Sequence, residues 1–565
     1  MKKVIETTLT KSLHGSTSSV KERAMKNLIV FAFALIMILP ACTQKGTAVW
    51  VASPWQRVMR STPPGELKEV KLKAAANEYE PFRLIIHSGT RPLKDVNVTV
   101  SSLKSANGEI SASNIQLYRA NYLNITKPSN RTKNPVGWYP DALIPFMEPQ
   151  AGNKNGNVTY VAAPFSVDTA QNAEVWCDVF VPSGTKPGMY MGTATVLVGK
   201  RKLANVPIEL NVWDFELPDK ITMLSHFGSF NRDAAKMMGI EAGSEEFYAI
   251  EALYDKELLK HRAVPATPDN IWPEWNEKEG IIEHGEAERM KQLVEVEHFN
   301  ALDIPFRYKD DPKKCKAYLA ATAEWVNKLG YLSMTYMYLE DEPNNAEQYE
   351  TVRKQGALIK SANPGIARLC TEQTITSNPQ WGNLYGAVDI WCPLWGLWND
   401  STAKERLARG EKLWSYTALC QGPEGTPWWQ IDMEPIYFRS PMWISWHFDI
   451  TGFLYWSSVW WNGYQTMQGV WEAPAFRNNF WGEGMLLYPG QPAGIKGFVP
   501  SIRLKLYREA MEDYEYMTMA AKLGKGEEVN KIVDGIATSF QAWSHEQGAY
   551  EQARERLAEL IQRKK

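Results

Sequence analysis

The sequence predicts a multidomain β and α/β protein with three structured parts: a β-sandwich, a (β/α)8 barrel and a C-terminal helical region. Two changes of rhythm along the 565 residues support this division. Short runs of alternating hydrophobic and polar residues recur up to Pro218, and apolar strands then alternate with helical segments. Beyond residue 498 the apolar residues follow helical spacing instead. The expected parts are therefore 48–218, 219–498 and 499–565.

The predicted sandwich rests on short strands that are separated by turn residues, as between Ser88 and Thr90 or between Pro182 and Gly184. Strands at this spacing are typical of two packed antiparallel sheets. The predicted strands lie at 70–72, 82–86, 96–100, 175–181, 194–198 and 206–212.

The predicted barrel rests on eight apolar strands within about 280 residues, close to the roughly 250 residues that such barrels usually need. Helical patterns at 245–261, 315–329 and 346–361 lie between some of the strands. The predicted strands lie near 223–228, 263–267, 305–308, 334–339, 367–371, 388–392, 412–417 and 452–456.

Composition excludes few functions, but it disfavours nucleic-acid binding. The net charge is -2, from 62 basic and 64 acidic residues, whereas a nucleic-acid partner would call for a basic surface. The cysteines after Cys42 are widely spaced, with no C-x-x-C pair, and no phosphate-binding or zinc-binding motif is present. We therefore expect no metal, no cofactor and no nucleic-acid partner.

The N-terminus has the pattern of an export signal. Met25 and Lys26 precede an apolar run at 28–39, which is too short for a comfortable membrane span and ends just before Cys42. A small residue directly before this cysteine resembles the bacterial lipobox, in which the cysteine is lipidated. We expect 1–42 to be a lipoprotein signal with Met25 as the true start, and 43–47 to be a tether. The protein would then lie in the bacterial envelope, periplasmic or on the outer-membrane surface, with a lipid anchor as its only membrane contact; the alternative is a plain secretory signal.

The stretch with most chemical information is Glu340-Asp341-Glu342-Pro343, which follows the apolar run 334–339. The C-terminal ends of barrel strands supply the active site, so these carboxylates are candidate catalytic groups. The alternative is an acidic turn that starts the next helix, because carboxylates favour helix N-termini.

Aromatic residues form a second candidate group, because 12 of the 23 tryptophans fall between Trp381 and Trp461. Their faces stack on sugar rings, although many must belong to the core. His226 and Arg307, in or next to predicted strands, could bind sugar hydroxyls. The aromatic candidates at predicted strand ends are Trp391, Trp395, Trp398, Tyr416, Trp456, Trp460 and Trp461.

Three motifs together resemble glycoside hydrolase family 123. They are the acidic run at 339–343, Trp138-Tyr139-Pro140-Asp141 in the sandwich, and the run at 501–516, SIRLKLYREAMEDYEY. The resemblance implies an exo-acting β-N-acetylgalactosaminidase with a sandwich, a catalytic barrel, and Asp341 and Glu342 as the catalytic pair. It also implies substrate-assisted hydrolysis, in which Asp341 orients the 2-acetamido group and Glu342 is the acid and base. Tyr416 or Trp456 could donate to the acetamido oxygen.

The expected function is thus removal of terminal β-linked N-acetylgalactosamine from a glycan by a retaining mechanism. One alternative is a glycosidase of the same fold that acts on another sugar, with Glu340 or Glu372 completing a two-carboxylate mechanism with Glu342. The other is a non-catalytic glycan-binding lipoprotein. For all three functions the expected partner is a glycan, and for the expected N-acetylgalactosaminidase this glycan carries a terminal N-acetylhexosamine.

Overall fold

The structure is a computed structural model that describes residues 46–146, 158–283, 285–376, 378–419, 422, 424–477 and 479–563. Residues from Ala48 to the C-terminus form one compact unit. The predicted signal and Cys42 lie outside the described residues. Within the described part of the chain, no helix has both the length and the apolar character needed to cross a membrane.

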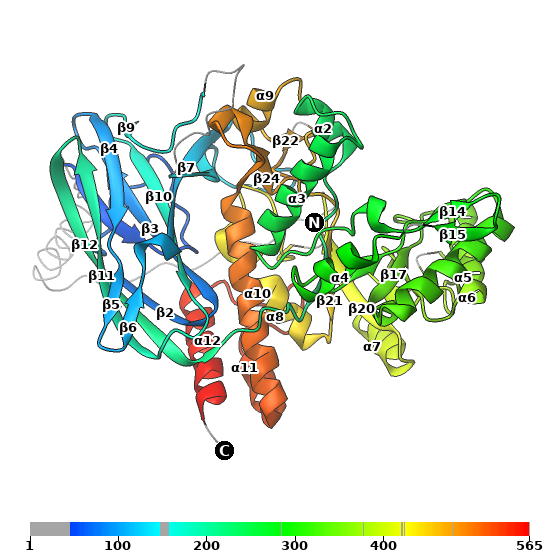
Figure 1. Cartoon of the computed structure of the whole chain (residues 1–565). Coiled ribbons are helices and arrows are strands. Elements are labelled where there is room, and N and C mark those ends of the chain that lie inside the picture. The colour runs from blue at the N-terminus through cyan, green and yellow to red at the C-terminus, as the bar shows by residue number, and fades with distance from the viewer. Residues whose placement is uncertain are drawn as a thin grey trace, which may run out of the picture. The chain divides into compact units, whose positions relative to one another are not determined.

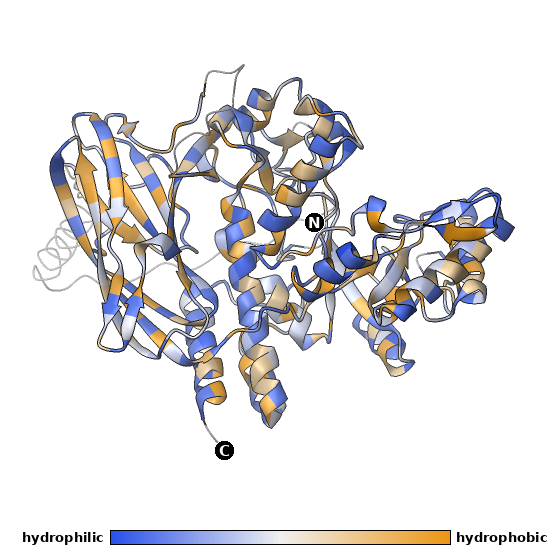
Figure 2. Cartoon of the chain, viewed as in Figure 1, coloured by the Kyte–Doolittle hydropathy of each residue, from blue (hydrophilic) through white to orange (hydrophobic). Residues whose placement is uncertain are grey.

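The N-terminal region is a sandwich of two mainly antiparallel sheets (Figure 1). One has the order β1-β3-β10-β7-β8, and the other β2-β12-β11-β4-β9 with β5 and β6 at its side. Hydrophobic and hydrophilic residues alternate along these strands (Figure 2), so one face of each sheet packs into a shared core. Each of the six predicted strands lies within an observed one: β2 Val70–Ala76, β3 Glu78–His87, β4 Leu93–Val100, β10 Asn172–Val181, β11 Gly188–Val198 and β12 Arg201–Glu216. The others are β1 Ala48–Ala52, β5 Leu103–Ser105, β6 Gly108–Ile110, β7 Ile115–Ile125, β8 Gly137–Pro145 and β9 Phe165–Val167.

The second region is built on a parallel sheet of seven strands in the order β13-β21-β20-β19-β18-β17-β16. The first strand of the region, β13, pairs with the last, β21, as it would in a barrel. The strands are β13 Leu224–His226, β16 Leu302–Asp303, β17 Thr335–Tyr338, β18 Ala367–Cys370, β19 Ile390–Trp391, β20 Lys412–Thr417 and β21 Gly452–Tyr455.

The predicted second strand, 263–267, is not a strand among the described residues, so a complete (β/α)8 barrel is not confirmed. The segment lies in the gap between β13 and β16. The Phe227 amide donates to the carbonyl of Val264, and the Thr267 amide donates to the Asp303 carboxylate at 2.6 Å. Pro265 and Pro268 lack the amide hydrogens that a strand ladder needs.

The predicted third strand is also displaced. It forms at Leu302–Asp303 rather than at 305–308, because Pro305 ends the ladder and Tyr308 has a positive φ of 58°.

The three predicted helices form with side-chain caps from Ser244, Asp311 and Asn345. They are α3 Glu245–Leu259, α5 Pro312–Lys328 and α6 Ala346–Ala362. The remaining α-helices of this region are α2 Arg232–Met237, α4 Ala287–Glu295, α7 Asp400–Ala408, α8 Ser440–His447 and α9 Met467–Glu472. The region also contains three short strand pairs: β14 Glu274–Asn276 with β15 Ile281–Glu283, β22 Ala475–Phe476 with β23 Phe480–Trp481, and β24 Leu487–Pro489 with β25 Phe498–Pro500.

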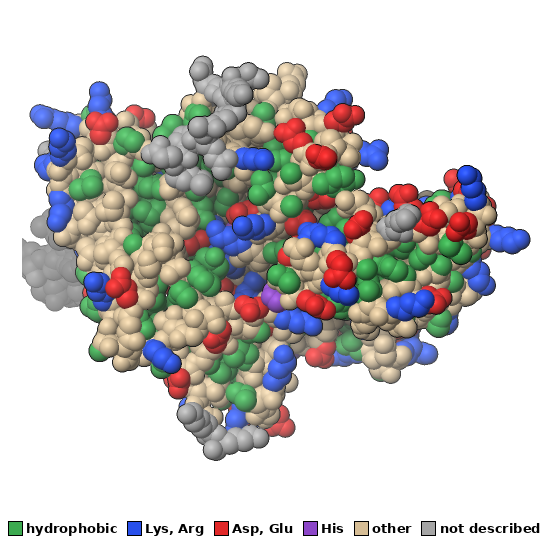
Figure 3. All heavy atoms as spheres, in the orientation of Figure 1, with side chains coloured by type: hydrophobic (Ala, Val, Ile, Leu, Met, Phe, Trp, Pro, Cys, Tyr) green, Lys and Arg blue, Asp and Glu red, His purple; other side chains and the backbone are tan. Residues whose placement is uncertain are grey.

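The C-terminal region is helical, with α10 Ile502–Ala520, α11 Gly526–Asp534 and α12 Gln547–Gln562. Almost every residue of α10 is buried, because this helix packs on α8 and also on β3 and β8 of the sandwich (Figure 1). Arg503 of α10 forms a buried ion pair with Asp141 at 2.9 Å, so two of the three sequence motifs that carry the family resemblance meet here. On the face drawn in Figure 3, acidic and basic side chains are interspersed.

Candidate active site

The acidic motif begins where β17 ends. The strand stops at Tyr338, so the alternation of side chains along a strand no longer governs Asp341 and Glu342. Glu342 adopts a left-handed backbone with a φ of +46°, a strained conformation for a residue other than glycine. Its amide donates to the hydroxyl of Thr371 at 3.1 Å, which fixes the turn against the end of β18.

Asp341 is held by two hydroxyl groups. The Tyr338 phenol donates to its Oδ1 at 2.6 Å, and the Thr371 hydroxyl donates to the same oxygen at 3.1 Å. Burial, and then the nearby Asp341 carboxylate, raise the pKa of Tyr338 well above its usual range. Tyr338 therefore stays a donor, and Asp341 has a fixed orientation with its second oxygen free of these two contacts.

Glu342 is held by a different partner, the phenol of Tyr416 on β20, which donates to its Oε1. Burial, and then the Glu342 carboxylate, raise the pKa of Tyr416, so Tyr416 also remains protonated. In the sheet, β18 and β19 lie between β17 and β20. The Glu342 side chain therefore extends across the C-terminal edge of the sheet, whereas Asp341 stays beside its own strand. Both carboxylates are exposed to solvent.

Two further carboxyl groups lie near the pair. Glu340 is half-buried, and the Cys370 thiol donates to its backbone carbonyl at 3.5 Å. Glu372, just after β18, is buried and accepts a hydrogen bond from the Tyr349 phenol at 2.8 Å. Burial raises the pKa of Glu372 to about 7, and the charge of Glu342 adds to this shift.

Trp456 follows β21 and is held in place by residues that the sequence analysis missed. Its indole N–H donates to the buried Glu483 at 2.7 Å, and Gln430 donates to the other Glu483 oxygen at 2.5 Å. A Cβ at Gly484 would lie 2.3 Å from the Trp456 ring. The Trp-Gly-Glu-Gly run at 481–484, an acidic residue between glycines, is a sequence signal that could have indicated this position. Because the indole N–H is already used, we correct the expectation that it serves the acetamido oxygen.

The other predicted aromatic residues divide into two groups. Trp460 is half-buried and packs against Trp456, with ring centroids 5.0 Å apart. Trp398 is half-buried and packs on Phe448 and Phe540.

Three of the tryptophans that we expected to bind sugar are core residues instead, which corrects that expectation. They are Trp391, Trp395 and Trp461, which are 1%, 1% and 0% exposed. Their indole N–H groups donate to protein acceptors, namely Glu411, Ser415 and the carbonyl of Leu487. The position of a tryptophan at a strand end does not determine whether its ring packs against the surrounding helices or faces the C-terminal edge of the sheet.

His226 is the last residue of β13, and Arg307 follows β16, the neighbour of β17 in the sheet. The His226 Nδ1 lies 2.7 Å from the Tyr336 phenol, and burial lowers the pKa of His226, with Asp303 opposing this. Arg307 donates to the Asp269 carboxylate at 3.0 Å and to the Pro273 carbonyl at 3.1 Å. These contacts support the 269–273 loop, and a role of Arg307 in binding sugar hydroxyls stays a prediction. Among the described residues, no group of three or more His, Cys, Asp or Glu side chains is arranged to hold a metal ion.

Comparison with known proteins agrees with this arrangement. The sequence model "Glycoside hydrolase 123, catalytic domain" matches residues 284–520, and "Glycoside hydrolase 123 N-terminal domain" matches 55–198. A family 123 glycoside hydrolase from Clostridium perfringens, described for glycolipid glycan hydrolysis, aligns at 15% identity over 91% of this chain and 97% of its own, with a TM-score of 0.66. That likeness shows the fold.

Two other structures are far less similar. A family 39 glycoside hydrolase from Bacteroides cellulosilyticus aligns at 12% identity over 77% of this chain and 83% of its own, with a TM-score of 0.29. A xyloglucanase from Bacteroides ovatus aligns at 7% identity over 82% of this chain and 100% of its own, with a TM-score of 0.27, and neither score carries an argument. No curated protein sequence matches significantly. The two sequence models together account for both the sandwich and the region that holds Asp341 and Glu342, so this chain belongs to glycoside hydrolase family 123.

Proposed function

We propose that this glycoside hydrolase removes terminal β-linked N-acetylgalactosamine from glycans by substrate-assisted, retaining hydrolysis. The observation that carries the proposal is the separate support of the two adjacent carboxylates. Tyr338 and Thr371 hold Asp341 beside β17, whereas Tyr416 holds Glu342 farther across the sheet. Two neighbouring residues with different partners suit two different tasks on one side of a sugar.

In the first step, the oxygen of the substrate's own 2-acetamido group attacks the anomeric carbon while the glycosidic C–O bond breaks. Glu342 transfers its proton to the leaving oxygen, and Asp341 accepts the acetamido N–H and stabilises the positive charge of the cyclic intermediate. In the second step, the Glu342 carboxylate removes a proton from water, which attacks the anomeric carbon and reopens the ring. Such intramolecular attack can lower a barrier by roughly 7–11 kcal/mol when the groups are well oriented.

A two-carboxylate mechanism with Glu372 is the second candidate, because this buried carboxyl group lies close enough to Glu342 for its pKa to respond. A retaining pair of that kind needs carboxyl groups about 5–5.5 Å apart on opposite sides of the sugar. Such an enzyme would form a covalent glycosyl-enzyme and would not need the acetamido group.

The test compares nitrophenyl β-N-acetylgalactosaminide with the matching β-galactoside, which has a 2-hydroxyl. The proposal expects turnover of the first and almost none of the second. Comparable rates with a trapped glycosyl-enzyme would establish the two-carboxylate alternative, and binding without turnover of either would leave a glycan-binding protein.

We also propose that the enzyme is an envelope lipoprotein anchored through Cys42. The apolar run that ends at this cysteine supports the proposal. Several acyl chains hold a protein on a membrane, whereas one binds only marginally. Cys42→Ser should move the protein from the membrane fraction to the soluble fraction, and an unchanged membrane fraction would refute the anchor.

A further inference from the structure

A cavity of about 470 Å³ opens at the N-terminal ends of the parallel strands. It is lined by the first residues of five of these strands, whereas Asp341 and Glu342 lie beyond the last residue of β17. The cavity and the catalytic pair thus lie at opposite ends of the sheet. The five first residues are Leu224 of β13, Thr335 of β17, Ala367 of β18, Ile390 of β19 and Lys412 of β20.

The cavity exists because small side chains occupy this end of the sheet. Large branched residues usually fill the interior of a (β/α)8 barrel, but Ala301 and Ala367 line the space here. Tyr336 and Trp414 also line it, and both are buried, so they form its inner end. Their ring centroids lie 5.3 Å apart. The inner end of the cavity is therefore aromatic and apolar.

Three exposed lysines line the outer side of the cavity, which we call its mouth. Lys220 lies between the sandwich and β13, Lys412 begins β20, and Lys522 follows α10. Among the described residues, their ammonium groups have no ion-pair or hydrogen-bond partner, and no Asp or Glu lines the cavity. The mouth thus carries three positive charges that no lining carboxylate balances.

The carboxylates next to lining residues are already bonded elsewhere. Asp219 directly precedes Lys220, and it accepts a hydrogen bond from Asn77 at 2.7 Å. Glu515 accepts hydrogen bonds from the amide and the hydroxyl of Thr222, both at 2.7 Å. Because neither carboxylate lines the cavity, the positive charge at its mouth remains available to a ligand.

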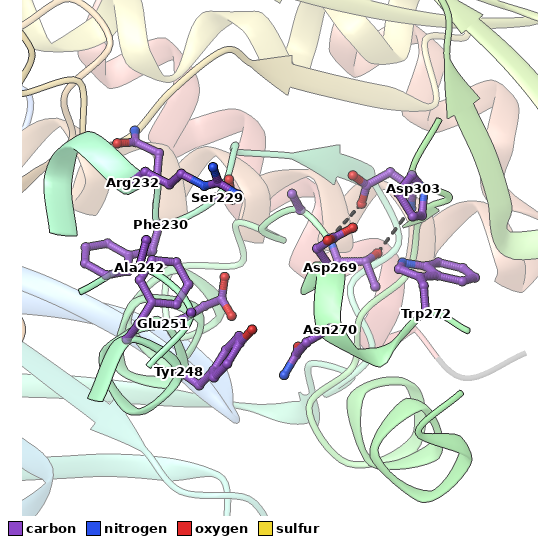
Figure 4. Close-up of a pocket in the computed structure, with 16 residues that line it drawn as sticks. Ser229, Phe230, Arg232, Ala242, Tyr248, Glu251, Asp269, Asn270, Trp272 and Asp303 are labelled. Carbon is purple, nitrogen blue, oxygen red and sulfur yellow. Dashed lines mark hydrogen bonds between the residues drawn. The ribbon is translucent and has the colours of Figure 1, made fainter. Parts of the chain in front are cut away.

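A cavity at the other end of the sheet has the opposite charge (Figure 4). It measures about 410 Å³ and lies beyond the ends of β13 and β16. Figure 4 shows Glu251 on one wall and Asp303 on the other. Asp269 lines it as well, and Arg232 is the one cation among its lining residues. Of these two cavities of similar size, only the one at the N-terminal ends of the strands therefore favours an anion.

The aromatic inner end and the cationic mouth together specify the chemistry of the ligand. The volume falls within the range of about 300–1,000 Å³ that is typical of small-molecule sites. The ring of an organic acid would pack against Tyr336 and Trp414 while its acidic group stays near the lysines. A neutral sugar would gain nothing from the lysines, an inorganic anion would leave the apolar end unfilled, and a cation would be repelled.

We propose that this cavity binds a small organic acid with an aromatic or alicyclic ring and one carboxylate or phosphate group. Lys220, Lys412 and Lys522 attract the acidic group, and Tyr336 and Trp414 contact the ring. The site is separate from the catalytic pair, so the inference does not depend on which glycan the enzyme cleaves.

Calorimetric titration of the protein with 2-naphthoate tests the proposal. Its neutral analogue 2-naphthamide has the same ring without the charge, and inorganic phosphate has charge without a ring. We expect one bound naphthoate per protein, with binding of naphthamide roughly tenfold weaker, because the combined effect of several exposed charge pairs is modest. Phosphate alone should bind more weakly than naphthoate. Naphthoate binding should also weaken as the salt concentration rises, because salt screens exposed charges.

Two variants separate the effect of charge from that of shape. Lys412→Gln combined with Lys522→Gln should weaken naphthoate binding roughly fivefold or more and leave naphthamide binding unchanged. Ala367→Leu fills the cavity and should abolish the binding of both compounds. Lys316→Gln changes an exposed lysine of α5 outside the cavity, and it should bind naphthoate like the wild type. Thermal unfolding midpoints establish that each variant is folded.

Several outcomes would overturn the proposal. Equal affinities for naphthoate and naphthamide would show that the lysines do not select an anion. Naphthoate binding that persists in Ala367→Leu would place the acid outside this cavity. Phosphate binding as tight as that of naphthoate would remove the role of the aromatic end, and no binding of naphthoate would refute the site. If Ala367→Leu does not fold, the lysine double variant, whose substitutions are on the surface, decides the question.

Discussion

The Tyr416 phenol donates a hydrogen bond to the Glu342 carboxylate, although the two residues are 74 positions apart and come from strands that are not neighbours in the sheet. Glu342 reaches this partner from a left-handed backbone conformation. The contact therefore uses a strained turn at one strand end and a buried hydroxyl on another. It fixes where a general acid would deliver its proton.

Removing this hydroxyl should slow catalysis without unfolding the protein. Tyr416→Phe keeps the ring in the core but leaves Glu342 free to rotate. A hydrogen bond to a charged group contributes about 1.5–3 kcal/mol, so we expect kcat to fall by roughly 10- to 150-fold. Steady-state kinetics on a substrate with a poor leaving group, such as a disaccharide with terminal N-acetylgalactosamine, measure this. Tyr190→Phe, which removes a phenol bound to the Lys186 carbonyl in the sandwich, should leave kcat unchanged. Equal kcat for Tyr416→Phe and wild type would show that the contact does not position the acid.

Glu372 should make folding stability depend on pH. Its pKa rises from 4.5 to about 7 in the folded protein, so between these values the folded state binds more protons than the unfolded state. Its contribution is complete below pH 4.5 and is lost as the pH rises through 7. Relative to Glu372→Gln, the wild-type free energy of unfolding should decrease by about 3 kcal/mol between pH 4.5 and 8.

Denaturant unfolding of both proteins at several pH values tests this difference. Tyr349→Phe offers a matched companion, because the Tyr349 hydrogen bond lowers the pKa of Glu372. Its loss should raise the pKa of Glu372 further, so the total decrease should be larger and should extend to higher pH. Parallel curves for wild type and Glu372→Gln would contradict the shift.

The sequence pattern predicts those elements whose stability comes from local hydrophobic periodicity. Strand β20 forms at the predicted residues, 412–417, and the six sandwich strands form because their alternation matches a two-sided sheet. The segment 263–267 reads as a strand by hydrophobicity alone, but Pro265 and Pro268 prevent its ladder. Trp395 and Trp456 both follow strands, yet only the three-dimensional packing places one in the core and the other beside Glu483. Tyr416 was predicted to lie in the site, but its contact with Glu342 and that of Thr371 with Asp341 could not be predicted, because these partners lie far away in sequence.

The buried carboxylate of Asp178 should stabilise the packing of the sandwich against α10. Asp178 of β10 bonds Lys505 at 2.6 Å and Arg508 at 3.1 Å, and all three side chains are fully buried. Asp178→Asn would leave two buried cations without their shared counter-ion, which typically costs 3–5 kcal/mol. We expect a lower urea midpoint, measured by tryptophan fluorescence. Lys202→Gln, on an exposed position of β12, is the control and should leave the midpoint unchanged. An unchanged midpoint in Asp178→Asn would show that the network adds no stability.

The catalytic pair gives the prediction that separates the two roles. If Glu342 is the acid, Glu342→Gln should lose least in the first step on substrates with good leaving groups. A nitrophenolate departs without much protonation, so the usual 10²- to 10⁴-fold contribution of a general acid shrinks there. If Asp341 orients the acetamido group, Asp341→Asn should lose activity on every leaving group to the same extent. It should also bind a thiazoline analogue of the cyclic intermediate more weakly, because transition-state-like ligands report that interaction.

Glu340→Gln is the matched control, since it changes the carboxyl group directly before the pair. Under substrate assistance it should leave kcat nearly unchanged, and Glu372→Gln should retain most of the activity because that residue forms no bond to the sugar. Pre-steady-state kinetics with nitrophenyl and poorer leaving groups provide the comparison. If Glu342→Gln lowers the rate of the first step by the same factor for all leaving groups, and Glu372→Gln abolishes a covalent intermediate, the nucleophile is Glu372. The acetamido group then takes no part in the reaction. If instead the loss in Glu342→Gln grows as the leaving group becomes more basic, the proton that the leaving oxygen receives comes from Glu342, held in place by Tyr416.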